Sequence, residues 1–512
     1  MKIVDITSKY GKIFATQRIK NKRVQTIIKD FEWYFYCDPL TPGDLQIVKK
    51  YAKKVAKHPG GLFKVYCENS DLNIWDLEKG KLDNKTIILN FLKDQKIKTY
   101  EADLSMAKRC LIDRGFEVDY DPLIAYIDIE TDDSKNGIEI GRDQILSFAV
   151  VINGKAHYYS DKSEEKVLLK IKSLFNYADI FVGWNSTNFD IPYILARFQV
   201  HGIEFYKSNL IHWDLMEIFK KRYRFSDQTA ITNFNLENIC QMFLGRGKIK
   251  HSESIKWLFD NAPERLKAYN IEDSMLMNDL DQKMGITELI RGICKESHTP
   301  YRNYYISEVV DNFVLQEAKL LGRILPSNLW KLENKTGASE KKKFTGGAVF
   351  EPILGIHENV TVLDYNSMYP NVIITFNIGI DTWIEYPSEE EKKTLIRSAN
   401  DCFFRSDIQS INAIVAHKLL KERQEVKDKM KRISKDDVEY RILNNRSEVI
   451  KVLNNSQFGA IGSEFTRFYS IKCSEAITMS AQYILKYSNK LFTQNGKLII
   501  SGDTDSVFVK DL

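Results

Sequence analysis

One short apolar strand constrains this chain more than any other feature of its sequence. The segment Ala125-Tyr-Ile-Asp-Ile-Glu130 carries two carboxylates, Asp128 and Glu130. Because side chains alternate between the two faces of a strand, both acids lie on one face, with Ile127 and Ile129 on the other. Burying two anions side by side is costly unless cations neutralise them. The pair indicates either a divalent-metal site or a strand end with two solvated acids, and alone it does not decide between them.

Two later segments supply further groups for a metal site. The polar run from Gly183 to Asp190 follows a predicted strand, and its acid stands at the start of a predicted helix. In Tyr269-Asn-Ile-Glu-Asp273 the first and last residues are four positions apart and share one helical face. The tyrosine can orient an attacking water, and Asp273 can bind metal. With two divalent ions, one activates water and the other stabilises the leaving oxygen. These segments favour a hydrolytic two-metal site.

A second set of acids lies near the end of the sequence. The apolar strand Val360-Thr-Val-Leu-Asp364 ends in a carboxylate, and residues 497–509 read as two strands joined by a turn that carries Asp503 and Asp505. A hairpin tip bearing acids beside another strand-end acid can hold two metal ions about 4 Å apart. A Gly-Asp turn alone is weak evidence, because such turns are common. The combination with Asp364 therefore carries the prediction.

The charged region between these acids reads as a helix pair. Arg423 and Lys427 are four residues apart, as are Lys451 and Asn455, so each pair projects from one side of its helix. Ser434, three residues before an acid, fits the N-cap of the second helix. If the helices are antiparallel, these groups line one surface that suits a nucleoside triphosphate. The alternative is an ordinary solvated helix pair.

Composition limits the class of protein. At 512 residues and 59.5 kDa, three or four domains are expected, and 43% hydrophobic content is ample for their cores. No apolar run has the length of a membrane helix, and the N-terminus lacks the core of a secretory signal, so we expect a soluble, cytoplasmic protein. The seven cysteines form no CxxC pair, which argues against a zinc ribbon or a disulfide framework. The net charge of +5 is mild, so nucleic acid would have to bind in local basic grooves.

Taken together, these segments resemble the motifs of family B DNA polymerases, especially archaeal ones, from about Glu101 onward. The upstream acids and tyrosine are similar to the Exo I, Exo II and Exo III motifs of DEDDy exonucleases. Asp364 to Pro370 resembles motif A, DxxSLYP, with Met368 in place of leucine. Lys451 to Gly459 resembles motif B, KxxxNSxYG, with Phe458 at the tyrosine position. The hairpin resembles motif C, YGDTDS, with serine at the tyrosine position.

The resemblance implies a multidomain α/β and α+β fold. It contains an N-terminal domain, a ribonuclease-H-like exonuclease domain, an incomplete ferredoxin-like palm and fingers formed by a helical hairpin. The last part of the exonuclease region may pack with the N-terminal domain in this scheme, and the thumb is absent. The expected ranges are 1–115 for the N-terminal domain, 116–325 for the exonuclease, 326–347 for a linker, 348–410 and 461–512 for the palm, and 411–460 for the fingers.

The resemblance also implies DNA-templated DNA synthesis with 3′→5′ proofreading. Each site would use two Mg²⁺ ions, for which Mn²⁺ can substitute. Tyr369 would be the steric gate against ribonucleotides, and Asp503 would support the polymerase site. Arg423, Lys427 and Lys451 would neutralise the triphosphate, with Asn455 on the same face. The implied metal ligands are Asp364 and Asp505 in the polymerase site, and Asp128, Glu130, Asp190 and Asp273 in the exonuclease site, where Tyr269 orients water.

The implied partners are primer–template DNA, dNTPs, a C-terminal polypeptide that carries the thumb, and a sliding clamp. The chain would then be the large part of a split or truncated polymerase. Two further segments fit the scheme: Lys220 to Phe225 as a contact for single-stranded DNA, although a solvated helix end is the simpler account, and Phe344 to Gly347 as the YxGG junction. Two rival functions stay open, namely an exonuclease without independent polymerase activity and a non-catalytic DNA-binding or assembly subunit.

Overall fold

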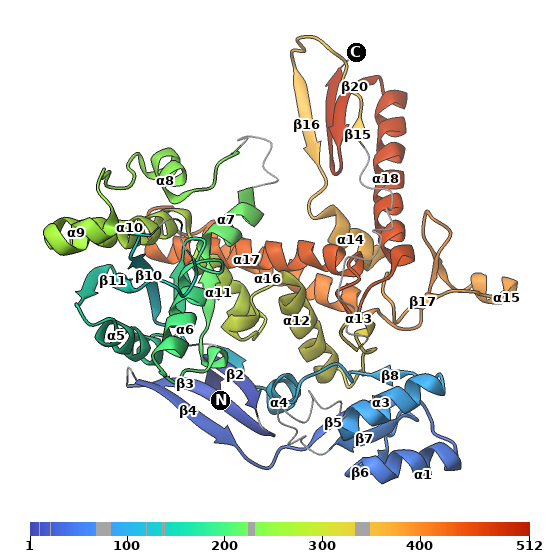
Figure 1. Cartoon of the computed structure of the whole chain (residues 1–512). Coiled ribbons are helices and arrows are strands. Elements are labelled where there is room, and N and C mark those ends of the chain that lie inside the picture. The colour runs from blue at the N-terminus through green and yellow to red at the C-terminus, as the bar shows by residue number, and fades with distance from the viewer. Residues whose placement is uncertain are drawn as a thin grey trace.

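The computed structural model describes residues 1–9, 11–20, 22–67, 83–118, 120–135, 137, 139–223, 231–332 and 349–511. The predicted YxGG junction at residues 344–347 and most of the predicted linker lie outside these ranges. So do the last two residues of the segment 220–225. Figure 1 shows the N-terminal region along the bottom, the region that carries the upstream acids at the left and the region that carries the downstream acids at the right and top. No helix among the described residues is long and apolar enough to cross a membrane.

The N-terminal region contains two small antiparallel sheets. The first has the order β2-β3-β4, and the second has the order β6-β7-β5-β8, with helices α1 and α3 packed against each other beside it. Phe35, Val65 and Ile88 lie in the core of the second sheet and its helices. The element bounds are β2 Asp5–Lys9, β3 Lys12–Ile19, β4 Lys22–Ile28, β5 Trp33–Cys37, α1 Pro42–Tyr51, β6 Lys54–Lys57, β7 Phe63–Cys67, α3 Asn84–Asp94 and β8 Thr99–Tyr100.

The upstream acids lie in a five-stranded mixed sheet of the order β12-β11-β10-β13-β14. Strands β10, β13 and β14 are parallel to one another, whereas β11 and β12 are antiparallel to their neighbours. The strands are β10 Ile124–Thr131, β11 Ile145–Ile152, β12 Lys155–Ser160, β13 Ile180–Gly183 and β14 His212–Asp214. The alternation predicted for β10 is confirmed, because Ile127 and Ile129 pack in the apolar layer formed with α5 and α6.

Helices cover both faces of this sheet. Helices α5 and α6 pack on the face of Ile127, and α10 packs on the face that carries the acids. The bounds are α5 Glu164–Tyr177, α6 Asp190–Val200, α7 Leu215–Tyr223, α8 Leu236–Leu244, α9 Ile255–Asn261, α10 Pro263–Met284, α11 Ile286–Glu296 and α12 Ile306–Leu320. The short strand β1 (Lys2–Ile3) pairs in parallel with β9 (Glu117–Val118). Strand β9 follows helix α4 (Met106–Arg114) and precedes β10 along the chain.

The region that carries the downstream acids is built on an antiparallel sheet of the order β15-β20-β21-β16. The helix α18 packs against β20, and α14 follows β16 along the chain. A small sheet of the order β17-β19-β18 lies at the right in Figure 1. The bounds are α13 Leu329–Leu332, β15 Val349–Phe350, β16 Val360–Asp364, α14 Met368–Thr375, β17 Trp383–Ile384, α15 Glu389–Lys392, β18 Ile396–Arg397, β19 Phe403–Phe404, α18 Ile471–Gln494, β20 Lys497–Asp503 and β21 Ser506–Asp511.

The predicted helix pair is confirmed as an antiparallel hairpin of α16 (Ile411–Met430) and α17 (Val438–Ile461). Two cross-helix hydrogen bonds fix the antiparallel register: Arg423 Nε donates to the carbonyl of Ser447, and Asn454 donates to the carbonyl of Ala416. The predicted N-cap at Ser434 is wrong. Asp437 caps α17 through a hydrogen bond from the backbone N–H of Glu439.

A buried arginine joins the N-terminal region to the region that carries the downstream acids. The side chain of Arg467 is 0% exposed and forms ion pairs with Asp103, at 2.8 Å, and with Asp311 on α12, at 2.5 Å. It also donates to the carbonyl of Pro326 at 2.6 Å. Lys108 on α4 binds Asp311 at 2.6 Å. Burial would raise the pKa of Asp311, but Arg467 and Lys108 outweigh it and hold that pKa below its usual range.

Replacing Arg467 by Met should destabilise the whole chain, because Asp103 and Asp311 would stay buried without their partner. We expect a loss of about 3–5 kcal/mol, measured by urea unfolding. The control is Lys431→Ala, which removes an exposed pair with Asp428 and should cost less than about 1 kcal/mol. Equal effects of the two substitutions would show that the arginine does not hold the regions together.

Candidate active sites

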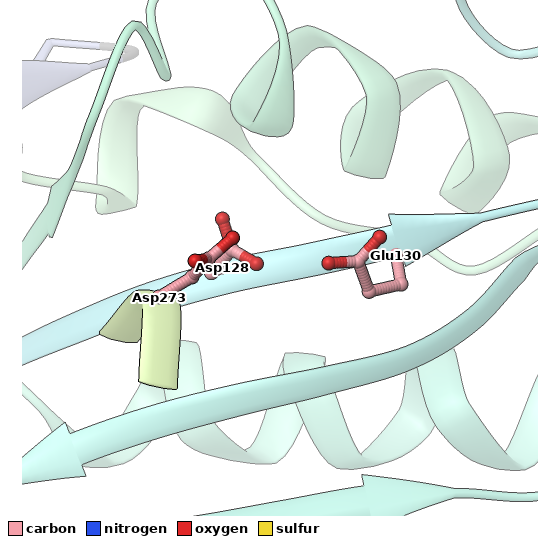
Figure 2. Close-up of side chains that lie close together, drawn as sticks. All are labelled: Asp128, Glu130 and Asp273. Carbon is pink, nitrogen blue, oxygen red and sulfur yellow. The ribbon is translucent and has the colours of Figure 1, made fainter. Parts of the chain in front are cut away.

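The structure brings three of the four predicted upstream acids into one cluster. One carboxylate oxygen from each of Asp128, Glu130 and Asp273 lies within 4.8 Å of the others. Figure 2 shows that Asp128 and Glu130 project from the same strand and that Asp273 reaches them from a helix. That helix is α10, whose packing against β10 and β11 sets the approach. In the described part of the chain, no other group of acids, histidines or cysteines meets this spacing.

Asp190 borders the cluster without belonging to it. It is the first residue of α6 and is 4% exposed. Its carboxylate accepts a hydrogen bond of 3.2 Å from the backbone N–H of Ile129, the residue between Asp128 and Glu130. Its negative charge also acts on Asp128 and Glu130 and raises the pKa of each. The structure therefore places all four predicted acids around one segment of β10.

The four acids suppress one another's ionisation. Burial, followed by the charges of Asp273, Glu130 and Asp190, raises the pKa of Asp128 well above its usual range. Burial and the charge of Asp273 raise the pKa of Glu130 to about 8. Burial raises the pKa of Asp190 to about 7 and also raises that of Asp273. Side chains of the protein thus neutralise this charge only in part, which is the environment in which divalent cations bind.

Lys248 supplies the positive charge at the cluster and was not predicted. Its ammonium lies 2.7 Å from the carboxylate of Asp273. Burial would lower the pKa of Lys248, but Asp273, Tyr269 and Asp128 outweigh it and raise that pKa. The residue lies in the loop between α8 and α9, where no helical or strand spacing links it to the acids. A local sequence pattern could not have identified it.

Two neighbours on α10 orient the acids. Tyr269 and Asp273 share one helical face as predicted, and a hydrogen bond from Tyr269 favours the ionised form of Asp273. The tyrosine ring also contacts His251 edge-on at 4.6 Å between centroids. Asn270, which was not predicted, donates to Asp128 at 2.7 Å and accepts from Ser147 at 3.2 Å. The amide therefore ties the helix to two strands.

The downstream acids gather at the tip of the β20–β21 hairpin and the end of β16. Asp364 is in register with Ser506 on β21, and the backbone N–H of Tyr365 donates to the carbonyl of Asp505 at 2.7 Å. Burial, and then the charges of Asp364 and Asp503, raise the pKa of Asp505. The predicted hairpin is present, and the charges of Asp364 and Asp503 both act on Asp505. They form a more open group than the upstream cluster, because Asp364 is exposed.

The predicted basic surface on the helical hairpin is present. Burial and the charges of Arg423 and Lys451 lower the pKa of Lys427, so the three cations face the same space. Glu448, which was not predicted, lies 4.0 Å from Arg423 and belongs to the same surface. Lys451 and Asn455 are both exposed one helical turn apart on α17.

Tyr369 connects this helix with the hairpin acids. Its ring packs on Phe458 of α17, with 4.5 Å between centroids and 34° between ring planes. Burial, and then the charges of Asp505 and Asp503, raise the pKa of the Tyr369 hydroxyl. The ring therefore stands between the downstream acids and the helix that carries Lys451. The segment from Lys220 has other contacts, with Lys220 over the ring of Phe234, so its role toward DNA stays a prediction.

Each of the two groups of acids lies in a segment that matches a known protein family. The model of DNA polymerase family B matches residues 303–511, and that of the RNase_H superfamily matches residues 125–284. The resemblance to family B DNA polymerases is therefore confirmed, with the family match over residues 303–511. The first match covers the downstream acids and the helical hairpin, and the second covers the upstream acids. The predicted fold class, with a ribonuclease-H-like domain beside a family B polymerase domain, is confirmed.

Similar proteins come from archaea. The chain is 26% identical over 386 residues to DNA polymerase 2 of Aeropyrum pernix, covering 69% of this chain and 45% of that protein. It is 28% identical over 450 residues to the DNA polymerase of a Desulfurococcus species, covering 80% and 56%. The chain thus spans about half the length of these relatives. The family B DNA polymerase of Pyrobaculum calidifontis has the same fold, with a TM-score of 0.72 and 20% identity over 100% of this chain and 74% of that one.

The raised pKa values predict how metal-free protein responds to pH. Glu130 and Asp190 have folded-state pKa values near 8 and 7, whereas unfolded values lie near 4. Folding therefore favours their protonated forms. The stability that these protonated acids contribute is fully present below about pH 4 and is lost as pH rises through 7 to 8. In EDTA, thermal unfolding should shift to lower temperature over that range. Glu130→Gln should stabilise the metal-free protein at pH 8 by an amount on the order of a few kcal/mol.

Mn²⁺ should reverse the loss in the wild type and have a much smaller effect on Glu130→Gln. The control is Glu264→Gln, which changes an exposed carboxylate on α10 and should behave like the wild type in EDTA at both pH 5 and pH 8. Stabilisation by Glu130→Gln that is equal at pH 5 and pH 8 would contradict the assigned pKa.

Proposed function

We propose that this chain carries out DNA-templated DNA synthesis from dNTPs and removes nucleotides from the 3′ end of the primer at a separate site. The proposal rests on one observation: strand-borne carboxylates gather at two distinct places, one within each family match. The upstream residues are proposed to hydrolyse phosphodiesters and the downstream residues to transfer nucleotides. Both reactions act at phosphorus and develop negative charge on oxygen, which explains the need for cations at both places.

The upstream residues fit a pair of divalent cations. Besides the mutually repelling acids, one carboxylate oxygen of Asp273 is buried without a hydrogen-bond partner, as expected of an atom that completes its coordination with metal. We propose that Asp128, Glu130, Asp190 and Asp273 hold two Mg²⁺ ions, which Mn²⁺ can replace. When bound, such ions activate water and stabilise the leaving oxygen. Asn270 fixes the carboxylate of Asp128, and Tyr269 orients water through its hydroxyl.

The downstream residues are proposed to act on the primer terminus and the incoming nucleotide. Asp364 and Asp505 would hold two Mg²⁺ ions that assist the 3′-hydroxyl and the departing pyrophosphate, with Asp503 in support. Tyr369, backed by Phe458, would contact the sugar and exclude a 2′-hydroxyl. On the hairpin, positive charge would neutralise the triphosphate. The residues proposed for this are Arg423, Lys427 and Lys451, with Asn455 beside them.

Exposed apolar residues beside the polymerase sheet support the proposal of a further polypeptide. β16 is an edge strand, and within it Val362 is 55% exposed and Leu363 is 40% exposed. On α18, Tyr487 is 52% exposed. Apolar surface of this kind on a sheet and its helix is usually covered by another element. We propose that a thumb-bearing polypeptide covers it and grips duplex DNA by its phosphates. A sliding clamp, and a cytoplasmic location in a prokaryotic cell or a viral host, are also proposed.

A second candidate is an exonuclease without independent polymerase activity. The compactness of the upstream cluster favours it, since three ligand oxygens already lie together there while Asp364 is exposed. A purely non-catalytic DNA-binding or assembly subunit is disfavoured, because a scaffold gains nothing from several buried, mutually repelling carboxylates.

Substitutions at the two sites should separate the two activities. Replacing Asp128 and Glu130 together by Ala should abolish 3′→5′ degradation of a labelled primer and leave extension unchanged. Asp364→Asn should lower extension by at least about 10³-fold and leave degradation intact, because it removes an anion that binds metal in the polymerase site. Both activities are measured on one gel with primer–template DNA, dNTPs and Mg²⁺.

Primer extension is measured with and without a candidate thumb-bearing polypeptide. Extension that appears only with this polypeptide supports the proposed partner. Degradation without extension under both conditions would contradict the polymerase proposal and support the second candidate. Loss of both activities on Asp364→Asn alone would contradict two separate sites.

A further inference from the structure

The position of Asp190 depends on the loop that precedes it, in which Asn188 donates to the carbonyl and to the side chain of Asn185. Asn185 adopts a left-handed conformation with φ +58°, which is uncommon for a residue other than glycine. Phe189 occupies the N-cap position of α6 and offers no side-chain hydrogen bond to the helix. Groups outside the loop therefore add to its internal hydrogen bonds in maintaining the conformation of residues 184–189.

Asp214 is the main such group. This residue ends β14 and is 1% exposed. One of its carboxylate oxygens accepts from the backbone N–H of Asn185 at 3.1 Å, and the other accepts from that of Thr187 at 2.9 Å. A single buried anion thus binds two amides of the loop. Hydrogen bonds to a charged acceptor are stronger than those between neutral groups, so the clamp is well suited to hold an unfavourable loop conformation.

The same carboxylate is itself anchored. It also accepts from the backbone N–H groups of Met216 at 3.1 Å and Glu217 at 3.2 Å, in the first turn of α7. A second contact joins the two segments, because the Ser186 hydroxyl lies 2.7 Å from Nε2 of His212. The loop therefore sits on a rigid base formed by the end of β14 and the start of α7.

The close approach of the segments leaves little space for the loop to shift. Gly183, the last residue of β13, is in register with Asp214. A Cβ at Gly183 would come within 2.5 Å of the Cβ of Ser186, so the loop folds tightly over the strand end. From this base the chain enters α6 at Asp190, whose carboxylate is bonded to the backbone between Asp128 and Glu130.

We propose that Asp214 is a positioning residue of the exonuclease site: it holds the loop 184–189 so that Asp190 faces the metal cluster. It touches neither metal nor substrate and acts only through the loop. The inference rests on the proposed function of the upstream site. Residues that orient metal ligands in this indirect way typically contribute 10- to 100-fold to metal affinity or activity.

The alternative is that Asp214 only caps α7, and the two roles can be separated by substitution. Serine is a good N-cap, because its hydroxyl can accept from the amides of the first turn. A serine hydroxyl has one oxygen on a shorter side chain and cannot also bind both loop amides. Asp214→Ser should therefore keep the cap of α7 and lose the clamp on Asn185 and Thr187.

The test measures Mn²⁺ binding to the full chain by electron paramagnetic resonance of free Mn²⁺. All proteins carry Asp364→Asn and Asp505→Asn, so that only the upstream site is titrated. Asp214→Ser should raise the Kd for Mn²⁺ by about 10- to 100-fold, with thermal unfolding in EDTA lowered no more than by Asp179→Asn. Without the two downstream substitutions, it should slow degradation of single-stranded DNA by a similar factor, leave KM for DNA unchanged and recover at high Mn²⁺ concentration.

Asp179→Asn is the matched control. Asp179 is also buried, stands just before the other end of β13, and accepts hydrogen bonds from the backbone of Leu123 and from Arg18. Its replacement should lower stability without changing the Kd for Mn²⁺. If the parent binds Mn²⁺ and the Asp214→Ser variant binds it equally tightly, the inference is overturned and the proposed function stays intact. A parent that binds no Mn²⁺ would contradict the proposed function, and the inference with it.

Discussion

The gathering of like charges on one apolar strand is the constraint on which the upstream half of the structure depends. Asp128 and Glu130 leave β10 on the same face, and α10 adds Asp273 to them. Burial raises the pKa of each acid, so the fold holds this site against its own repulsion. Lys248 offsets one of these charges. The remaining negative charge is the kind of environment that favours divalent cations.

The two sites differ in how far the fold alone prepares them. Upstream, helices cover both faces of the sheet, and a network that includes Asn270 and Ser147 sets the geometry before any substrate binds. Downstream, Asp364 is exposed at a sheet edge, and the predicted basic surface lies on a separate helical hairpin. A site of that kind is completed by its substrates. The Arg467 network joins the N-terminal region to the region that carries the downstream acids.

Sequence reasoning succeeded where the relevant contacts are local. Alternation along β10 separated Asp128 from Ile127, and spacing of four placed Tyr269 with Asp273. The hairpin of α16 and α17 was predicted from a charged helical region with an N-cap signal near its middle. The N-cap itself is Asp437 and not Ser434, because several polar residues nearby could compete for that role.

Contacts between distant segments were not predictable in this way. Asn270 and Asp128 are 142 residues apart, and Lys248 reaches Asp273 from a loop. Glu448 faces Arg423 only because the hairpin folds in one register. No periodicity marks such residues. Without the structure, an asparagine beside a tyrosine or a lysine in a loop is indistinguishable from any other polar residue.

The central claim is that the upstream acids form a metal site that exists without DNA, whereas the downstream acids need substrate. The most direct measurement is the anomalous scattering of Mn²⁺ in crystals of the protein soaked without nucleic acid. The account predicts a peak among Asp128, Glu130 and Asp273, with Lys248 displaced from Asp273, and a peak at Asp364 and Asp505 only after primer–template DNA and a dNTP are added. Absence of the upstream peak, or a peak only at the downstream acids in crystals without DNA, would contradict it.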